Sequence, residues 1–370
     1  MQIIKKNLIL YVSVFVLLLG ANIFTFHNHS FYNNPIVRID SADTAPSNSA
    51  SKSSNSEESL YDQVLEGRIM NSVYKGQTII LKNSFFSSEL YQDSFSKGDE
   101  VFITLNSQGS TSLSGTITGL KRDKYVVLLL SALLMLLVFL EKRKGLLTMI
   151  SLFLNITVFY SLLTWYQDGT DILTVCILAS LFFTLFSLTF LNGFSRKTLA
   201  AVLSTILSVT TTMAIFMVVM NNSREIDFAY MEYLIMPGDA RAIFLSGILI
   251  GGLGSIMDIA ITMSSAINEI QRKNPSVTVK ALFSSGRTIG DDIMGTMINV
   301  LLFTYVCGGI PMTILLLKND IPPANIISVY MPYEIYRFLI GSIGILLAIP
   351  VSLVISILFT KGGKHLCFWH

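Results

Sequence analysis

Charged residues are scarce in this chain. Asp, Glu, Lys and Arg together make up 14% of its 370 residues, against about 25% in soluble domains. The net charge of +2 is too small to indicate a nucleic-acid partner. Because 52% of the residues are hydrophobic, the composition argues against a soluble domain and indicates a chain that uses a lipid bilayer as its solvent.

Cysteine is also sparse, at Cys176, Cys307 and Cys367. None of the three falls between residues 27 and 122, a long segment without an extended apolar run, so the sequence gives no sign of a disulfide framework there. No P-loop motif is present, so NTPase activity is not indicated. The histidines near the two ends supply too few ligands for a structural metal site, and we expect no metal and no cofactor.

Long apolar runs take the place of charge. Residues 7–26 are long enough to cross a bilayer, and no small-x-small cleavage site follows them. Because Gly20-Ala21-Asn22-Ile23 fits the cleavage site of a signal peptide poorly, we interpret residues 1–26 as an uncleaved transmembrane anchor. Seven further candidate spans are 125–140, 145–164, 172–191, 198–220, 242–267, 293–317 and 338–360. The predicted fold is an α-helical polytopic membrane protein of about eight transmembrane helices, seven of them in a membrane domain at 125–361.

The segment between the first two spans divides into two parts. Residues 41–59 are rich in Ser, Asn and Ala, so we expect 27–63 to be a flexible linker that cannot bury enough apolar surface to order itself. Turn signals at Lys75-Gly76 and Lys97-Gly98-Asp99 separate short β-prone runs. These runs are 67–70, 77–81, 100–105 and 114–118. They predict a small β-barrel of the OB or SH3 kind over 64–122, for which a spacer and a binding module both remain open.

Basic residues are distributed unevenly among the loops. With the N-terminus inside, the loops on that side are rich in Lys and Arg, including 142–144 and 272–273. The short loops on the other side hold only Arg224, Arg241, Lys318 and Arg337. By the positive-inside rule we expect a cell-membrane protein with both termini in the cytosol, the tail at 362–370 included, and with residues 27–122 outside the cell.

Two successive spans carry polar residues on one side. Positions spaced three and four residues apart share a helix face, and in the span at 248–269 they are Gly251, Ser255, Asp258, Thr262, Ser265 and Glu269. The span at 291–311 repeats the pattern with Asp292, Thr296 (beside Gly295) and Asn299. An ionisable group inside a span must face protein or water. We therefore predict a polar intramembrane site comprising Asp258, Thr262, Ser265, Glu269, Asp291, Asp292, Thr296 and Asn299.

The ends and glycines of these spans allow a simpler interpretation. Asp291 and Asp292 are predicted at the N-terminus of their helix, where the helix dipole favours negative charge. Glycines let neighbouring backbones approach closely, and proline can break a helix. The predicted packing or helix-breaking positions are Gly251, Gly252, Gly254, Gly295, Gly308, Gly309 and Pro311. Tight packing and capping without a functional site is therefore the alternative.

The same residues carry a resemblance to a known family. They are Gly254-Ser255-Ile256-Met257-Asp258-Ile259-Ala260, Asn274-Pro275, and the run SGRTIGDDIMGTMIN at 285–299. This signature resembles that of the YibE/F-like bacterial membrane proteins, whose usual pattern reads G-R-x-I-G-R-D-I-M-G-T-M-x-N. Asp291 stands where the pattern has its second arginine, so a negative charge replaces a positive one. The resemblance covers about residues 60–360. It implies the long form of the family, with an outer domain and a shorter paralogue as partner.

Three functions fit these residues. The first is a non-enzymatic transporter- or channel-like protein whose polar helices, 248–269 and 291–311, line a pathway. The alternative is a non-catalytic scaffold or accessory subunit that pairs with a shorter paralogue or a second copy. The third, ranked lowest, is an intramembrane aspartyl hydrolase that uses Asp258 with Asp291 or Asp292. Hydrolases of the presenilin type have a Gly-x-Gly-Asp motif, and Thr288-Ile289-Gly290-Asp291 lacks its first glycine. The sequence indicates no substrate.

Overall fold

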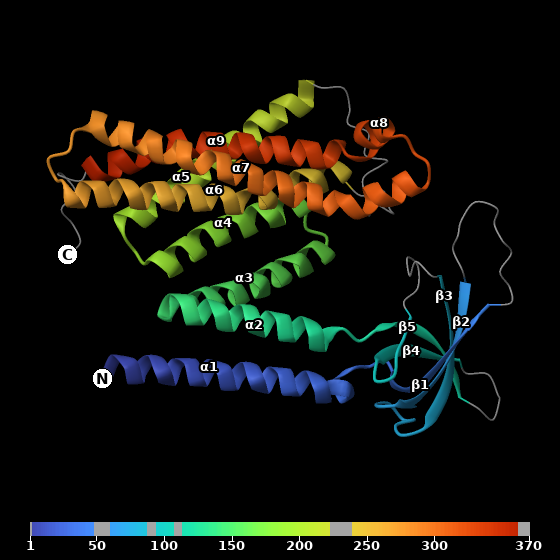
Figure 1. Ribbon diagram of the computed structural model, residues 1–370. Helices are drawn as coiled ribbons and strands as arrows, with labels where there is room; N and C mark the ends of the chain where they lie inside the picture. Colours follow the sequence, from blue (N-terminus) through green and yellow to red (C-terminus); the bar gives the residue numbers. More distant parts are fainter. Residues whose placement is uncertain (1, 48–59, 87–93, 107–112, 223–238, 362–370) are drawn as a thin grey trace. The chain divides into compact units, whose positions relative to one another are not determined.

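The protein consists of two compact units. The computed structural model describes residues 2–47, 60–86, 94–106, 113–222 and 239–361 (Figure 1). The chain divides into Met1–Leu146 and Leu147–His370. The first unit holds a long helix, a β-barrel and a second long helix, and the second unit holds a bundle of the remaining long helices.

A five-stranded barrel lies between the first two long helices in the chain. Its strands are β1 (Ile36–Pro46), β2 (Leu60–Ile69), β3 (Thr78–Phe86), β4 (Glu100–Asn106) and β5 (Ser114–Leu120). They close in the order β1-β2-β3-β5-β4, with β3 and β5 parallel and the other neighbours antiparallel. Alternate side chains of β2, including Leu65 and Ile69, are buried in the barrel core, as a strand with one inward face requires. The predicted small β-barrel is confirmed.

The barrel begins earlier in the chain than the sequence pattern predicts. Strand β1 (Ile36–Pro46) and the first residues of β2 lie within 27–63, which we expected to be a flexible linker. That expectation is wrong for these residues, because Ile36 and Val37 are completely buried and contribute the apolar burial that the polar residues after them lack. Residues 48–59, the most polar part of the segment, lie outside the described residues.

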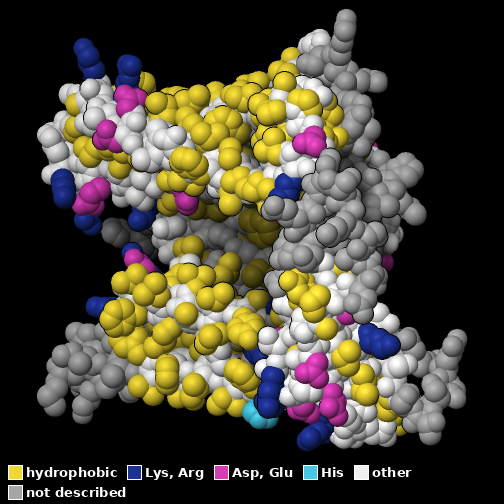
Figure 2. All heavy atoms as spheres, turned by 45° about the vertical axis from the view of Figure 1, so that its right-hand side comes forward, with side chains coloured by type: hydrophobic (Ala, Val, Ile, Leu, Met, Phe, Trp, Pro, Cys, Tyr) yellow, Lys and Arg dark blue, Asp and Glu magenta, His cyan; other side chains and the backbone are white. Residues whose placement is uncertain are grey.

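Eight helices in the described residues are long and apolar enough to cross a membrane. They are α1 (Gln2–His27), α2 (Asp123–Glu141), α3 (Arg143–Gln167), α4 (Ile172–Asn192), α5 (Arg196–Asn222), α6 (Ala240–Lys273), α7 (Val279–Lys318) and α9 (Pro332–Lys361). The short elements are η1 (Asn28–Phe31) after α1, and α8 (Pro323–Asn325) with the π-helical η3 (Ile326–Tyr330) before α9. Each long helix overlaps one predicted span, so the polytopic α-helical fold is confirmed. Hydrophobic side chains cover much of the helices' visible surface (Figure 2).

Helices α6 and α9 form the centre of the second unit. Ile259, Met263 and Ile267 of α6 are buried with Ile345 and Leu353 of α9 in one hydrophobic cluster. Their three- and four-residue spacing places the apolar side chains of α6 on one stripe. The stripe that α6 turns toward α9 is therefore separate from its polar residues.

Helix α7 packs on α9 through two glycines. A Cβ atom at Gly286 would collide with the Leu353 side chain, and one at Gly290 would collide with the Ile349 side chain. Only glycine therefore allows this close approach of the two helices. The contact fixes which side of α7 faces the bundle.

Helix α7 begins earlier than its predicted span and continues past its predicted break. It begins at Val279, where the Thr278 hydroxyl accepts a hydrogen bond from the Ala281 amide at 3.2 Å. Asp291 and Asp292 therefore lie inside the helix, and their predicted place at its N-terminus is wrong. The predicted break at Pro311 is also wrong, since the helix runs unbroken to Lys318. Proline removes only one backbone donor, and the turns on both sides of it stay helical.

Candidate functional site

The polar residues of α6 lie opposite its packed stripe. Asp258 and Thr262 are exposed in the single chain, and Ser265 and Glu269 are half-buried. At about 100° per residue, these four positions fall within one narrow sector of the helix. Gly254 lies in the same sector, and a Cβ atom there would meet nothing within 4 Å. This sector, called the α6 polar face below, is therefore open in the described chain.

The polar residues of α7 also face away from the bundle. Asp292, Gly295, Thr296 and Asn299 are all exposed. They lie on the side opposite Gly290, which contacts α9. This side is called the α7 polar face. It is unpartnered among the described residues, although a bilayer does not solvate carboxylates and amides.

Some predicted site residues are paired within their own helix. The Thr296 hydroxyl donates to the Ile293 carbonyl at 2.8 Å. An Asp291 carboxylate oxygen lies 3.9 Å from Arg287 Nε, one turn earlier. The Glu269 carboxylate lies 3.0 Å from the Arg272 guanidinium and 3.7 Å from the Lys273 ammonium. Such exposed pairs each contribute little to stability.

Asp258, Asp292 and Asn299 differ from these residues. Within the described part of the chain, none of the three side chains has a hydrogen-bond or ion-pair partner. The structure therefore leaves the two polar faces open and joins them by no hydrogen bond or ion pair between described residues.

Distance along each helix separates the predicted residues further. At about 1.5 Å per residue, Asp258 lies about 25 Å from Arg241 at the start of α6. Asn299 lies about 28 Å from Lys318 at the end of α7, and Asp292 about 39 Å from it. The hydrocarbon core of a bilayer is about 30 Å thick. Asp258 and Asn299 therefore fall within the apolar span counted from these charged ends, and Asp292 falls beyond it.

The predicted glycines have different surroundings. Gly251 lies beneath the Tyr305 hydroxyl of α7, and Gly252 faces Gly341 of α9, so both stand at helix contacts. Among the described residues, a Cβ atom at Gly295 or Gly308 would meet nothing within 4 Å, so close helix packing does not require glycine at these two positions. Close packing therefore explains only part of the glycine pattern.

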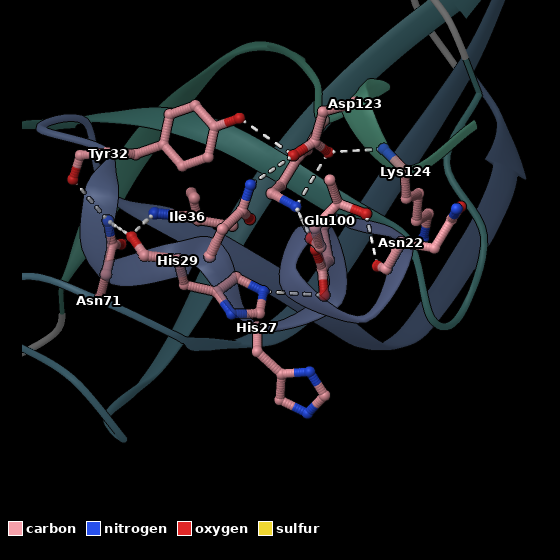
Figure 3. A network of polar contacts seen from close by, with 12 residues as sticks. Asn22, His27, His29, Tyr32, Ile36, Asn71, Glu100, Asp123 and Lys124 are labelled. Carbon is pink, nitrogen blue, oxygen red and sulfur yellow. Dashed lines mark hydrogen bonds and ion pairs between the residues drawn. The ribbon is translucent and has the colours of Figure 1, made fainter. Parts of the chain in front are cut away.

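A second polar cluster lies where the barrel meets its two helices (Figure 3). Its centre is Lys121, whose side chain is 0% exposed. The Lys121 ammonium lies 2.9 Å from Asp123 Oδ1 and 3.4 Å from Glu100 Oε2, and it donates to the Thr25 carbonyl at 3.0 Å. His29 Nε2 lies 3.0 Å from Glu100 Oε1. The cluster ties the end of α1, strand β4 and the start of α2 together.

Two further side chains complete this cluster. Asn28 Nδ2 and the Tyr32 hydroxyl donate to Asp123 Oδ2 at 2.8 and 3.0 Å. Burial, followed by the hydrogen bond to Asp123, raises the pKa of the Tyr32 phenol. Asn71 Nδ2 donates to the carbonyls of three residues between 29 and 34, and its Oδ1 accepts the Ile36 amide at 2.7 Å. Asn71 thereby fixes the chain that enters the barrel.

Sequence reasoning missed this cluster. Lys121 lies between the last predicted strand and the second span, where a lysine is usually assigned to the headgroup layer. One sequence feature could have indicated it. Lys121 and Asp123 are two opposite charges spaced two residues apart in the short connection between the barrel and the second span. Within the described residues, no three His, Cys, Asp or Glu side chains are arranged to hold a metal ion. His365 and Cys367 lie outside the described residues.

The eight apolar helices of the described residues, with a barrel inserted after the first, define a multi-pass membrane protein that carries a small folded β-domain. A family model described as YibE/F-like protein matches residues 129–362, and one described as the YibE/F family N-terminal domain matches residues 30–120. The chain belongs to the YibE/F-like family. No curated protein and no solved structure matches it.

Proposed function

We propose that this chain is a transporter- or channel-like membrane protein whose α6 polar face lines a hydrophilic pathway. The observation that carries the proposal is Asp258. Its carboxylate is exposed, lacks a partner among the described residues, and lies within the apolar part of its helix. An intramembrane carboxylate must meet water, a cation or a polar group of another chain. Gly254, one turn earlier on the same face, leaves room beside it.

The remaining polar residues extend this pathway. Asp258 and Asn299 act as coordinating groups inside the span, while Glu269, Asp291 and Asp292 act at its mouth, where they attract cations. No catalytic step is assigned to Asp291, because its carboxylate is paired with Arg287 on its own helix. The proposal therefore concerns passage of a polar solute rather than hydrolysis.

The test is water access to single cysteines. In a background with Cys176, Cys307 and Cys367 replaced by serine, Thr262→Cys places a thiol on the α6 polar face. Val354→Cys is the matched control, because Val354 is 47% exposed on α9. It also lies close to the depth of Thr262, since Ser264 and Ser356 share a hydrogen bond at 2.7 Å.

A charged thiosulfonate reagent that does not cross lipid modifies a thiol only where water reaches it. We expect Thr262→Cys to react and Val354→Cys to remain unmodified in intact membranes. Equal protection of both thiols would contradict a pathway along α6. A Gly254→Cys variant repeats the measurement one turn beyond Asp258.

A second function is favoured by the α7 polar face. Asp292, Thr296 and Asn299 point away from the helices that α7 packs on. Hydroxyl and amide side chains exposed to lipid are satisfied when another helix covers them. We propose that a second chain, either the shorter paralogue or another copy, covers this face and that the protein acts as one subunit of an assembly.

A photo-crosslinking residue at position 299 tests this assembly. In membranes that contain the shorter paralogue, we expect an adduct with the mass of a heterodimer or of two copies. The same residue at Leu339, which is 48% exposed on α9, is the control. Lipid adducts alone at position 299 would argue against the subunit role.

The orientation is part of the proposal. The lysines and arginines on the N-terminal side of the bilayer support cytosolic termini and an external barrel. Protease added outside intact cells is expected to cut a site inserted after Gly76, a turn residue with positive φ. It is expected to spare the same site inserted after Pro275 between α6 and α7.

A further inference from the structure

A polar cavity of about 240 Å³ lies in the second unit where α5 begins and α6 and α9 end. Three cations line it: Arg196, Lys197 and Arg272. At about 30 Å³ per water, the cavity has room for a group several times the size of a water. No acidic side chain lines it among the described residues.

The placement of two of these cations conflicts with local helix electrostatics. Arg196 and Lys197 are the first two residues of α5, where the helix dipole disfavours positive charge. Lys197 is half-buried and has no hydrogen-bond or ion-pair partner in the described part of the chain. An anion held between α5 and α6 would offset both the unfavourable interaction of these cations with the helix dipole and the partial burial of the unpaired Lys197 ammonium.

Besides the cations, the cavity is lined by uncharged polar groups and by the apolar side chains of Ala200 and Phe359. Ser264 and Ser356 are 1% and 2% exposed, and their hydroxyls share a hydrogen bond at 2.7 Å. Asn268 adds an amide to the wall. Gln271 Oε1 is buried and has no hydrogen-bond partner in the described chain. An anionic group in the cavity would satisfy the cations that line it. The Gln271 amide oxygen is shielded from solvent, so a ligand in the cavity does not reach it.

Most of this cavity lies to one side of the α6 polar face, and Arg272, which pairs with Glu269, stands at the border of the two. Ser264 and Gln271 are offset by about 100° or more around α6 from Ser265 and Glu269. The cavity lies toward α5 and α9, whereas the α6 polar face is open. The pathway proposed above therefore leaves the cavity without an explanation.

We propose that the cavity binds the phosphate group of a phosphate ester, such as a glycerophosphate. Arg196, Lys197 and Arg272 contact the phosphate oxygens, because guanidinium and ammonium groups make strong charge-assisted hydrogen bonds to phosphate. The same chemistry is presented by a phospholipid headgroup at the membrane boundary and by a soluble phosphate ester.

The experiment measures thermal unfolding of the purified full chain in detergent. One arm adds sn-glycerol 3-phosphate, and the other adds phosphatidylglycerol, with phosphatidylcholine as the lipid control. A rise in Tm in the first arm identifies a soluble ligand, and a rise in the phosphatidylglycerol arm alone identifies a lipid headgroup. No rise in either arm beyond that of phosphatidylcholine would overturn the proposal.

Matched variants assign the effect to the cavity. Arg272→Gln and Lys197→Gln are each expected to weaken binding roughly tenfold or more, the size of one charge-assisted hydrogen bond. Lys273→Gln is the control, because Lys273 also pairs with Glu269 but does not line the cavity. Lys197→Arg keeps the charge and is expected to retain binding, which distinguishes a lost site from a lost fold. Equal weakening by Lys273→Gln would show diffuse charge attraction and refute the site.

Discussion

The cluster around Lys121 yields the sharpest prediction about stability. The change is Lys121→Met, which keeps a long side chain and removes the ammonium group. It leaves the Glu100 and Asp123 carboxylates, which lie 3.4 and 2.9 Å from the ammonium, without their shared cation. The Thr25 carbonyl loses its donor as well.

The expected loss of stability follows from how deeply these three side chains are buried. Lys121 is 0% exposed, and the side chains of Glu100 and Asp123 are 11% and 21% exposed. Breaking a buried ion pair by removing one partner costs about 3–5 kcal/mol, and partial exposure of the carboxylates favours the lower value. A loss of about 3 kcal/mol corresponds to a more than 100-fold rise in the open population of the barrel.

Hydrogen exchange of the full chain in lipid nanodiscs measures this opening. Amides of β4 and β5 are expected to exchange more than 100-fold faster in Lys121→Met. Lys124→Met is the control, since the Lys124 ammonium lies over the Tyr125 ring at 5.1 Å and such a contact contributes about 0.5–1 kcal/mol. Exchange in Lys121→Met that matches this control would refute the view that Lys121 holds the barrel to its helices.

Three other predictions follow from single contacts. Asn71→Ala removes three donated hydrogen bonds and one accepted bond, and we expect it to lower the stability of the barrel by about 2–4 kcal/mol. Hydrogen exchange at the Ile36 amide should then be faster, and unchanged exchange there would contradict the prediction. Gly290→Val places a side chain against Ile349 and is expected to lower Tm through overpacking of about 1–3 kcal/mol, whereas Gly295→Ala, in open space, is expected to leave Tm nearly unchanged. Hydrogen bonds from Ser47 and Ser84 hold the pKa of Asp62 below its usual value. The Asp62 carboxylate therefore stabilises the fold at any pH above its unfolded-state pKa of about 4. This contribution is lost as the pH falls through the lower pKa of the folded state. Pairing of β2 with β3 should then weaken on acidification in the wild type but change less in Ser84→Ala, and identical pH profiles would disprove the linkage.

Apolar periodicity predicted most of the fold because it reports burial directly. The eight spans and the barrel follow from run length, alternation and turn residues such as Gly76 and Gly98, which both adopt positive φ. Strand β1 was missed because Ile36 and Val37 form a very short apolar run beside a long polar one. The early start of α7 was missed because its first apolar run, at 281–283, is short, and the polar residues at 284, 285, 287 and 288 separate it from the long apolar span.

The candidate site could be predicted only in part for a related reason. Three- and four-residue spacing placed Asp258, Thr262 and Ser265 on one side of α6, and the structure has them there. Spacing cannot tell which side a neighbouring helix covers, so the exposure of Asn299 needed the position of α9. Nor can it bring together Lys121 and Glu100, which are distant in sequence and meet only when the barrel closes.

The barrel is bonded to a helix both where the chain enters it and where the chain leaves it, and this has a mechanical consequence. Lys121 joins Thr25 in the last turn of α1 and Asp123 at the start of α2 to Glu100 of the barrel. Asn28, which follows α1, also bonds Asp123. The connection between β5 and α2 is only two residues long, and Asn71 holds the connection between α1 and β1 through three backbone carbonyls. A sideways force on the barrel, such as that exerted by a bound molecule, is therefore transmitted to both helices at once and tilts them as a pair.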